Sequence, residues 1–139
     1  MIINMKELAP LLSEVKTIAV IGAVDKPTRP VDQVGREMIA MGFNVIPVHP
    51  KRNDIWGLKT YPTVNDIPVP VDVVDLFRNA QFCPDHAREV LKMTPLPKIF
   101  WMQSGVYSPE AREILAGSGI VVVEDRCLKV ELKAMGISR

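Results

Sequence analysis

The sequence is poor in cysteine and histidine, and neither sign of charge predominates. It has two cysteines, Cys83 and Cys127, and two histidines, His49 and His86. Their spacing does not fit a zinc site, and two cysteines do not form the disulfide framework of a small secreted domain. Seventeen Lys and Arg residues against sixteen Asp and Glu residues give a net charge of +1. We therefore expect no nucleic-acid partner and no membrane surface as a partner.

Long hydrophobic runs are also missing. No stretch reaches the roughly 18 apolar residues that cross a bilayer. Residues 1–15 lack the basic, apolar and small-residue order of a signal peptide, so we expect a cytoplasmic protein. The length of 139 residues, with 47% hydrophobic and 24% charged residues, suits one globular domain. We expect a single domain over residues 1–139, with a lead-in helix within residues 1–16.

What the sequence does contain is an alternation of short apolar runs and amphipathic segments. Apolar runs without alternation are typical of strands that are buried on both faces of a parallel sheet. The expected strands are residues 17–21, 43–48, 56–61, 72–77, 98–102 and 120–124. The expected helices are residues 5–15, 31–41, 84–93, 109–116 and 128–135. This pattern predicts an α/β fold with a single doubly wound parallel sheet, Rossmann-like, in the strand order 3-2-1-4-5-6.

Two of these strands have features that favour a position at the edge of the sheet. Residues 56–61 form the weakest run, and they are counted as an edge strand, third along the chain. Pro47 lies inside the second run, and proline removes a ladder hydrogen bond, so this strand must place it near an end or an edge.

In this order the direction of winding changes between residues 17–21 and 72–77, and ligands bind beyond the carboxyl ends of the strands at such a point. Most strands are followed there by a cation. The cations are Lys26, Arg29, Lys51, Arg52, Arg78 and Arg126. The fifth strand is followed instead by Gln103, Ser104 and Gly105. With the helix N-termini at the same edge, this charge predicts an anion site; a rim of scattered solvated charges is the alternative.

The loop after the first strand differs from a dinucleotide fingerprint. Of the pattern Gly-x-Gly-x-x-Gly only the first glycine, Gly22, is present, and Ala23 and Val24 follow it. Lys51 follows the second strand, where NAD proteins carry an acidic residue for the ribose. These differences disfavour NAD and favour a nucleotide with an additional ribose phosphate. No Walker loop is present, so ATP hydrolysis is not expected.

Several short motifs occur in a specific order between residues 17 and 132. They include Ile-Ala-Val-Ile-Gly at 18–22, Val-Ile-Pro-Val at 45–48, Val-Asp-Val-Val-Asp at 71–75, Phe-Arg-Asn at 77–79, Trp-Met-Gln at 101–103 and Asp-Arg-Cys at 125–127. In these motifs the chain resembles the single-domain CoA-binding proteins, which are similar to the N-terminal CoA-binding domain of the succinyl-CoA synthetase alpha subunit.

The resemblance implies a Rossmann fold with coenzyme A, or acyl-CoA, as the ligand. The residues expected to contact it are Gly22, Ala23, Val24, Lys26, Arg29, Pro50, Lys51, Phe77, Arg78, Gln103, Ser104, Gly105, Arg126 and Cys127. By position, Gly22 approaches the pyrophosphate, Lys51 the nucleotide phosphates, Phe77 and Arg78 the adenine side, and residues 103–105 the pantetheine arm. Where relatives tend to have small hydroxyl residues, this chain has Val24 and Val31, which cannot donate a hydrogen bond to a phosphate.

No nucleophile and base occur as a pair, so the sequence favours a non-catalytic CoA-binding protein, a carrier, sensor or regulator. A subunit or remnant of an enzyme that handles acyl-CoA is the alternative, followed by an NAD(P)-binding protein. We expect His49 to be a loop residue and His86 a surface residue.

The two cysteines are interpreted separately. Cys83 is placed at a helix start, where a thiolate is stabilised, and Cys127 lies beside Arg126 at the binding edge. Their strands are separated by one strand, roughly 10 Å, so no disulfide between them is expected. A mixed disulfide with the CoA thiol and a simple packing role both stay open.

Overall fold

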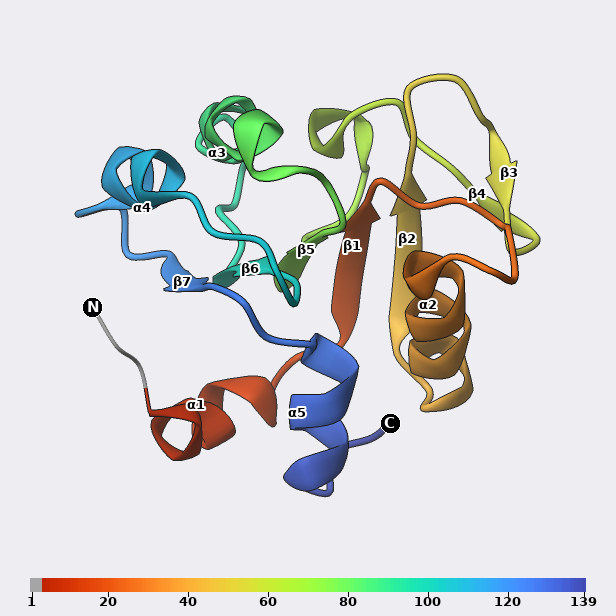
Figure 1. Ribbon diagram of the computed structural model, residues 1–139, viewed down its shortest axis with the longest axis horizontal. Coiled ribbons are helices and arrows are strands. Elements are labelled where there is room, and N and C mark those ends of the chain that lie inside the picture. Colours follow the sequence, from red (N-terminus) through yellow and green to blue (C-terminus); the bar gives the residue numbers. More distant parts are fainter. Residues whose placement is uncertain (1–3) are drawn as a thin grey trace.

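A five-stranded parallel sheet forms the centre of the protein in the computed structural model, which describes residues 4–139 (Figure 1). The strands lie in the order β2-β1-β5-β6-β7 and every neighbouring pair is parallel. Their bounds are Thr17–Ile21 for β1, Asn44–Val48 for β2, Val73–Leu76 for β5, Ile99–Met102 for β6 and Val121–Val123 for β7. The predicted α/β, Rossmann-like fold class is confirmed.

The prediction for residues 56–61 was wrong. These residues do not form an edge strand of the sheet. Instead β3 (Asp54–Ile55) and β4 (Leu58–Lys59) pair as a separate antiparallel hairpin. Its turn is Trp56–Gly57, with φ of 58° and 72°, the left-handed conformation that two-residue hairpin turns require. The observed sheet is therefore the predicted order without its third strand.

Pro47 explains why the sheet ends at β2. Within residues 4–139 a single bridge extends the sheet beyond β2, between Val48 and Tyr61. In a parallel ladder the N–H and C=O of one residue face the same neighbour, and the Pro47 carbonyl accepts the Tyr61 N–H at 3.2 Å. The position that lacks an N–H therefore faces the outer edge, so pairing cannot continue from Tyr61 toward the hairpin.

Helices cover both faces of the sheet (Figure 1). Their bounds are Met5–Leu12 for α1, Pro30–Ala40 for α2, Cys83–Val90 for α3, Pro109–Leu115 for α4 and Leu128–Ala134 for α5. Helix α1 is the predicted lead-in helix; it ends at Leu12, three residues earlier than expected, and the expected span 1–16 includes residues 1–3, which lie outside the described part. No helix within residues 4–139 is both long and apolar enough to cross a membrane.

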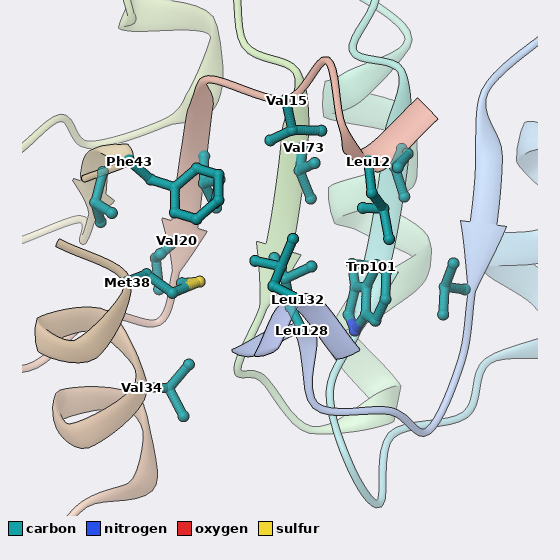
Figure 2. Packing of buried hydrophobic residues seen from close by; sticks show 14 of the residues in the cluster. Leu12, Val15, Val20, Val34, Met38, Phe43, Val73, Trp101, Leu128 and Leu132 are labelled. Carbon is teal, nitrogen blue, oxygen red and sulfur yellow. The ribbon is translucent and has the colours of Figure 1, made fainter. Parts of the chain in front are cut away.

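Two buried clusters hold these layers together. Val20, Val73 and Trp101 point to the face covered by α1, α2 and α5, where they pack against Leu128 and Leu132 (Figure 2). The alternate strand residues point to the other face and pack against α3 and α4. Because both faces of the strands are buried, their sequences are continuously apolar.

Candidate functional site at the carboxyl edge of the sheet

The direction of winding changes between β1 and β5, which are adjacent although far apart in sequence. The chain leaves β1 toward α2 on one face and leaves β5 toward α3 on the other. A cleft of about 360 Å³ opens here, on the face of α2 and α5; we call it the α2–α5 cleft. Its lining residues are Arg29, Pro30, Val31, Val34, Phe77, Arg78, Asn79, Gln103, Ser104, Val106 and Cys127.

A second cavity, the α3 hollow, lies on the other side of the same edge and has a volume of about 220 Å³. It is lined by Ile21, Gly22, Val48, Pro50, Pro62, Thr63, Val64, Arg78, His86 and Glu89. Arg78 lines both cavities, and its guanidinium carbon lies 4.1 Å from the ring centre of Phe82. The two cavities therefore meet at one cationic side chain.

Gly22 allows the two strand ends to come this close. Its φ is +85°, and a Cβ atom at this position would lie 2.4 Å from the Phe77 carbonyl oxygen. Only glycine combines that conformation with so close an approach. The glycine expected at the pyrophosphate is thus required by the backbone itself.

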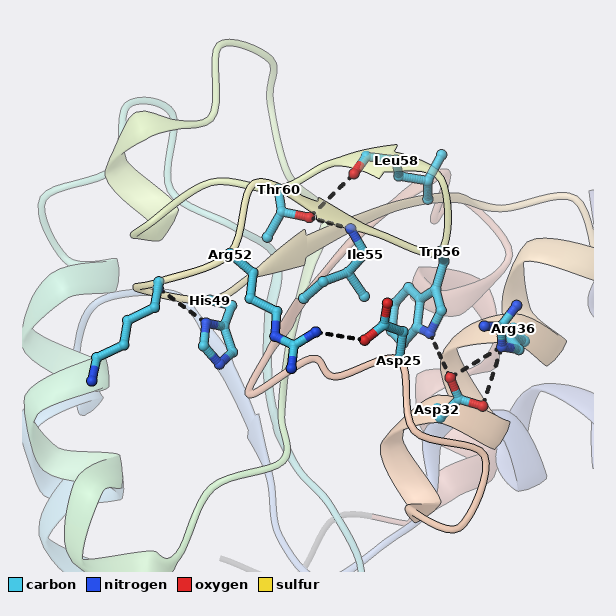
Figure 3. Close-up of polar contacts among 10 residues, drawn as sticks. Asp25, Asp32, Arg36, His49, Arg52, Ile55, Trp56, Leu58 and Thr60 are labelled. Atoms are coloured by element: carbon cyan, nitrogen blue, oxygen red, sulfur yellow. Dashed lines mark hydrogen bonds and ion pairs between the residues drawn. The ribbon is translucent and has the colours of Figure 1, made fainter.

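The cations predicted at this edge divide into two groups. Arg52 pairs with Asp25 at 2.9 Å (Figure 3), and Arg126 pairs with Glu131 at 3.3 Å. The other four of these predicted cations, Lys26, Arg29, Lys51 and Arg78, form no ion pair within residues 4–139. Of these, Arg29 and Arg78 line the α2–α5 cleft. Fewer of the predicted cations are uncompensated than the sequence suggested, and two of these four lie at the cleft.

His49 responds to this positive charge. Partial burial, and then the charges of Arg52, Arg78 and Lys51, lower the pKa of His49. Its Nδ1 accepts the Lys51 backbone N–H at 3.0 Å (Figure 3), so the ring orders the loop after β2. A field that disfavours an additional proton favours an anion at the same edge.

The predicted ligand contacts do not all line these cavities. Those that do are Gly22, Arg29, Pro50, Phe77, Arg78, Gln103, Ser104 and Cys127. Those that line neither are Ala23, Val24, Lys26, Lys51, Gly105 and Arg126. The Ala23 side chain is fully buried, and Val24 is partly buried and packs against the core. Val31 is 3% exposed and forms part of the cleft wall.

Gln103 and Cys127 form one end of the α2–α5 cleft. Gln103 is 5% exposed, and its Oε1 accepts the Leu128 backbone N–H at 2.9 Å. Its Nε2 lies 3.7 Å from Cys127 Sγ, and Cys127 is only partly buried. The thiol is thus held at the cleft wall by a buried amide.

Asp125 joins the two loops that form this wall. Its carboxylate accepts the Gly105 N–H at 2.6 Å and the Tyr107 O–H at 2.5 Å. The Tyr107 hydrogen bond, followed by that from Gly105, lowers the pKa of Asp125. The loops after β6 and β7 are therefore tied together beside the cleft.

The expectation for the Cys83 thiolate was wrong. Cys83 is the first residue of α3 but is fully buried, and burial raises the pKa of its thiol to about 11. Both cysteines are free. Desolvation of the thiolate therefore has a larger effect on the pKa than the position of Cys83 at the start of a helix.

Three candidate functional residues were not predicted from the sequence. His86 and Glu89 line the α3 hollow, with Nδ1 and Oε1 2.6 Å apart; their spacing of three residues on a helix was the available signal. Asp75 is completely buried in β5, and in the described part of the chain neither carboxyl oxygen has a hydrogen-bond partner. An acidic residue inside an otherwise apolar central strand was its signal. No cluster of three metal-ligating side chains occurs within residues 4–139.

Fold and site together define a Rossmann-type α/β domain with a ligand-sized cleft at its switch point. The sequence matches the CoA binding domain family over residues 16–133, and the chain belongs to that family. The family resemblance predicted from the motifs is confirmed.

Three proteins illustrate the similarity. The uncharacterized protein YneT of Bacillus subtilis (strain 168) is 36% identical over 124 residues, which cover 89% of this chain and 90% of YneT. A solved structure from Thermus thermophilus is 40% identical, with a TM-score of 0.88, covering 96% of this chain and 99% of that one. The dinucleotide forming acetyl-coenzyme A synthetase 1 of Ca. Korarchaeum cryptofilum, solved with phosphate and ADP, is 25% identical, with a TM-score of 0.70. That match covers 83% of this chain but only 26% of the larger enzyme.

Proposed function

We propose that the protein binds coenzyme A or acyl-CoA across the α2–α5 cleft and the α3 hollow, as a carrier, sensor or regulator and not as a catalyst. One observation carries the proposal: in a chain of the CoA binding domain family, two cavities meet at the unpaired cation Arg78 at the switch point. The proposal places the protein in the cytoplasm.

The chemistry of the cavities suggests how the ligand is oriented. The α3 hollow takes the adenine nucleotide, because it opens beside Pro50 and the exposed Lys51. The pyrophosphate lies near Gly22 and Arg78, facing the N-terminus of α2, whose dipole favours an anion. The apolar wall of the α2–α5 cleft takes the pantetheine arm, which ends near Cys127.

The non-catalytic assignment rests on the groups at the sulfur end. Within residues 4–139 the hydrogen-bonding neighbour of the Cys127 thiol is the Gln103 amide, which cannot act as a base. A nucleophile for acyl transfer needs an adjacent base or another activating group.

The similarity to the acetyl-coenzyme A synthetase favours a second role. The part of that enzyme that matches this chain is about a quarter of its length. In that role the protein supplies the CoA-binding part of an assembly whose catalytic residues lie on another chain. Both roles require the same ligand.

Titration calorimetry with CoA and with dephospho-CoA, which lacks the ribose phosphate, tests the proposal. Lys51→Ala is expected to weaken CoA binding by about 10- to 150-fold, the range of a hydrogen bond to a charged group, and to weaken dephospho-CoA binding less. Arg88→Ala is the matched control, because Arg88 pairs with Asp85 on the exposed side of α3. No binding of CoA by the wild type overturns the proposal, and equal losses for both ligands remove Lys51 from it.

A further inference from the structure

The carboxyl group of Asp75 has no role in the fold described above. Asp75 lies in β5, the middle strand of the sheet, with an exposed fraction of 0%. Neither of its oxygens has a hydrogen-bond partner among residues 4–139. A buried polar group without partners weakens the protein that contains it. The residue therefore calls for an explanation other than stability.

Its position places it directly beneath the α2–α5 cleft. Side chains alternate along a strand, so Asp75 and Phe77 lie on the same face, and Phe77 lines the cleft. On the neighbouring strand Trp101 is the partner of Asp75, and Gln103, two residues further, lines the cleft. Asp75 is thus one step deeper than two residues of the cleft wall.

The segment that carries Cys127 packs against Trp101, the partner of Asp75 on the neighbouring strand. The Trp101 indole N–H donates to the Arg126 carbonyl at 2.7 Å, and Leu128 packs in the same cluster as Trp101 (Figure 2). Phe77 and Cys127 are only partly buried. A ligand in the cleft must displace these two side chains to reach the carboxyl, and rotamer changes of this kind are common on binding.

We propose that Asp75 is a ligand-binding residue whose carboxyl donates a hydrogen bond to the thioester carbonyl of an acyl group carried on CoA. The inference rests on the proposed function and goes beyond it, because it makes the acylated form the preferred ligand. Burial raises the pKa of Asp75 well above its ordinary range, which favours the protonated carboxyl, the form that has an O–H to donate. A thioester oxygen accepts such a bond, whereas the free thiol of CoA offers no carbonyl.

The affinities of acetyl-CoA and CoA, measured by calorimetry at neutral pH, test this assignment. The wild type is expected to bind acetyl-CoA about 2- to 12-fold more tightly, the range of one hydrogen bond. Asp75→Asn retains a donor and is expected to keep the preference. Asp75→Val removes the donor and is expected to bind both ligands equally, with the CoA affinity of the wild type.

Val73→Ala is the control, because Val73 lies on the same strand and face but one step further from the cleft. It is expected to lower the melting temperature and leave the preference unchanged. Asp75→Ala replaces Asp75→Val if the latter does not fold. An equal affinity of the wild type for both ligands, or a preference that survives removal of the carboxyl, overturns the inference. Binding of neither ligand by the wild type overturns the proposed function instead.

Discussion

Among single residues, Asp75 makes the stability of the protein depend on pH. Burial raises its pKa in the folded protein, whereas the pKa of an aspartate in an unfolded chain is about 3.9. Between these two pKa values the folded protein retains a proton that the unfolded chain has released. The free energy of unfolding therefore falls as the pH rises, by up to about 1.4 kcal/mol per pH unit.

Asp75→Asn has no proton to lose at this position. Its free energy of unfolding, relative to that of the wild type, is expected to increase as the pH rises above the pKa of an unfolded aspartate. Urea denaturation of both proteins at pH 4, 6 and 8 measures the difference. A difference that is the same at all three pH values contradicts the raised pKa.

The two cysteines differ in access, and this difference predicts which of them reacts. Cys127 lines the cleft, whereas Cys83 is fully buried and its thiol has a pKa of about 11. With CoA disulfide, the Cys127 thiolate attacks one sulfur; a Cys127–CoA disulfide forms and the other CoA leaves as a thiolate. Because the site holds the reagent close, we expect one CoA adduct that dithiothreitol removes.

Intact-protein mass spectrometry measures this adduct. Cys127→Ser is expected to abolish it and Cys83→Ser to leave it unchanged. A wild-type protein that binds CoA but takes up none covalently assigns Cys127 a packing role only.

The sequence predicted those site residues whose position depends only on a strand end. Gly22, Arg78 and Gln103 follow β1, β5 and β6, and the topology alone brings them to one edge. Arg126 stays a prediction: its guanidinium pairs with Glu131 and lines neither cavity. The direction of a loop side chain depends on partners that a strand pattern does not reveal.

At the level of elements, the β3–β4 hairpin docks on α2 through one aromatic side chain. The Trp56 indole N–H donates to Asp32 Oδ1 at 2.9 Å, and Arg36 binds the same carboxylate at 3.0 Å (Figure 3). The indole lies so close to Gly35 that a Cβ atom there would be 2.2 Å from the ring. The absence of a side chain at Gly35 therefore leaves the space that the Trp56 ring occupies.

This packing predicts an unusual effect for a glycine-to-alanine change in a helix. Alanine normally stabilises a helix interior by about 1 kcal/mol relative to glycine. Gly35→Ala is expected to destabilise the protein by about 1–3 kcal/mol instead, because the indole must move away. In the background Trp56→Ala the same change is expected to be stabilising. Urea denaturation of the four proteins gives the coupling, and a stabilising Gly35→Ala in the wild-type background rules out the docking.

The helices and the five strands of the sheet could be predicted because their signals are local. Ser108 accepts the Ala111 N–H and Pro109 opens α4, as their order in the sequence predicted. The hairpin was missed because its turn is Trp56–Gly57 and lacks the Asn or Asp that usually marks such turns. Its location depends on the contact with α2, which lies outside any local window.

At the level of the whole molecule, the site extends across loops from both halves of the sheet. The α3 hollow is lined by residues from the loops after β1, β2 and β5, and the α2–α5 cleft by residues from the loops after β1, β5, β6 and β7. The order of the five strands predicted this meeting point before any side chain was placed. The depth of the cleft and the burial of Asp75 depend on the packing of α2 and α5, so the sequence could not show them.

A ligand that bridges these loops binds the folded chain and not the unfolded one, so binding adds to global stability. CoA at 100 times its dissociation constant is expected to add about 2.7 kcal/mol. For a chain of this size that corresponds to an increase of roughly 10 °C in melting temperature. NAD at the same concentration is expected to give a smaller shift, because it lacks the ribose phosphate and meets a loop with only the first glycine of the fingerprint. Differential scanning calorimetry compares the two ligands, and Lys51→Ala is expected to reduce the CoA shift selectively. A larger shift with NAD than with CoA reverses the ranking of the two ligands.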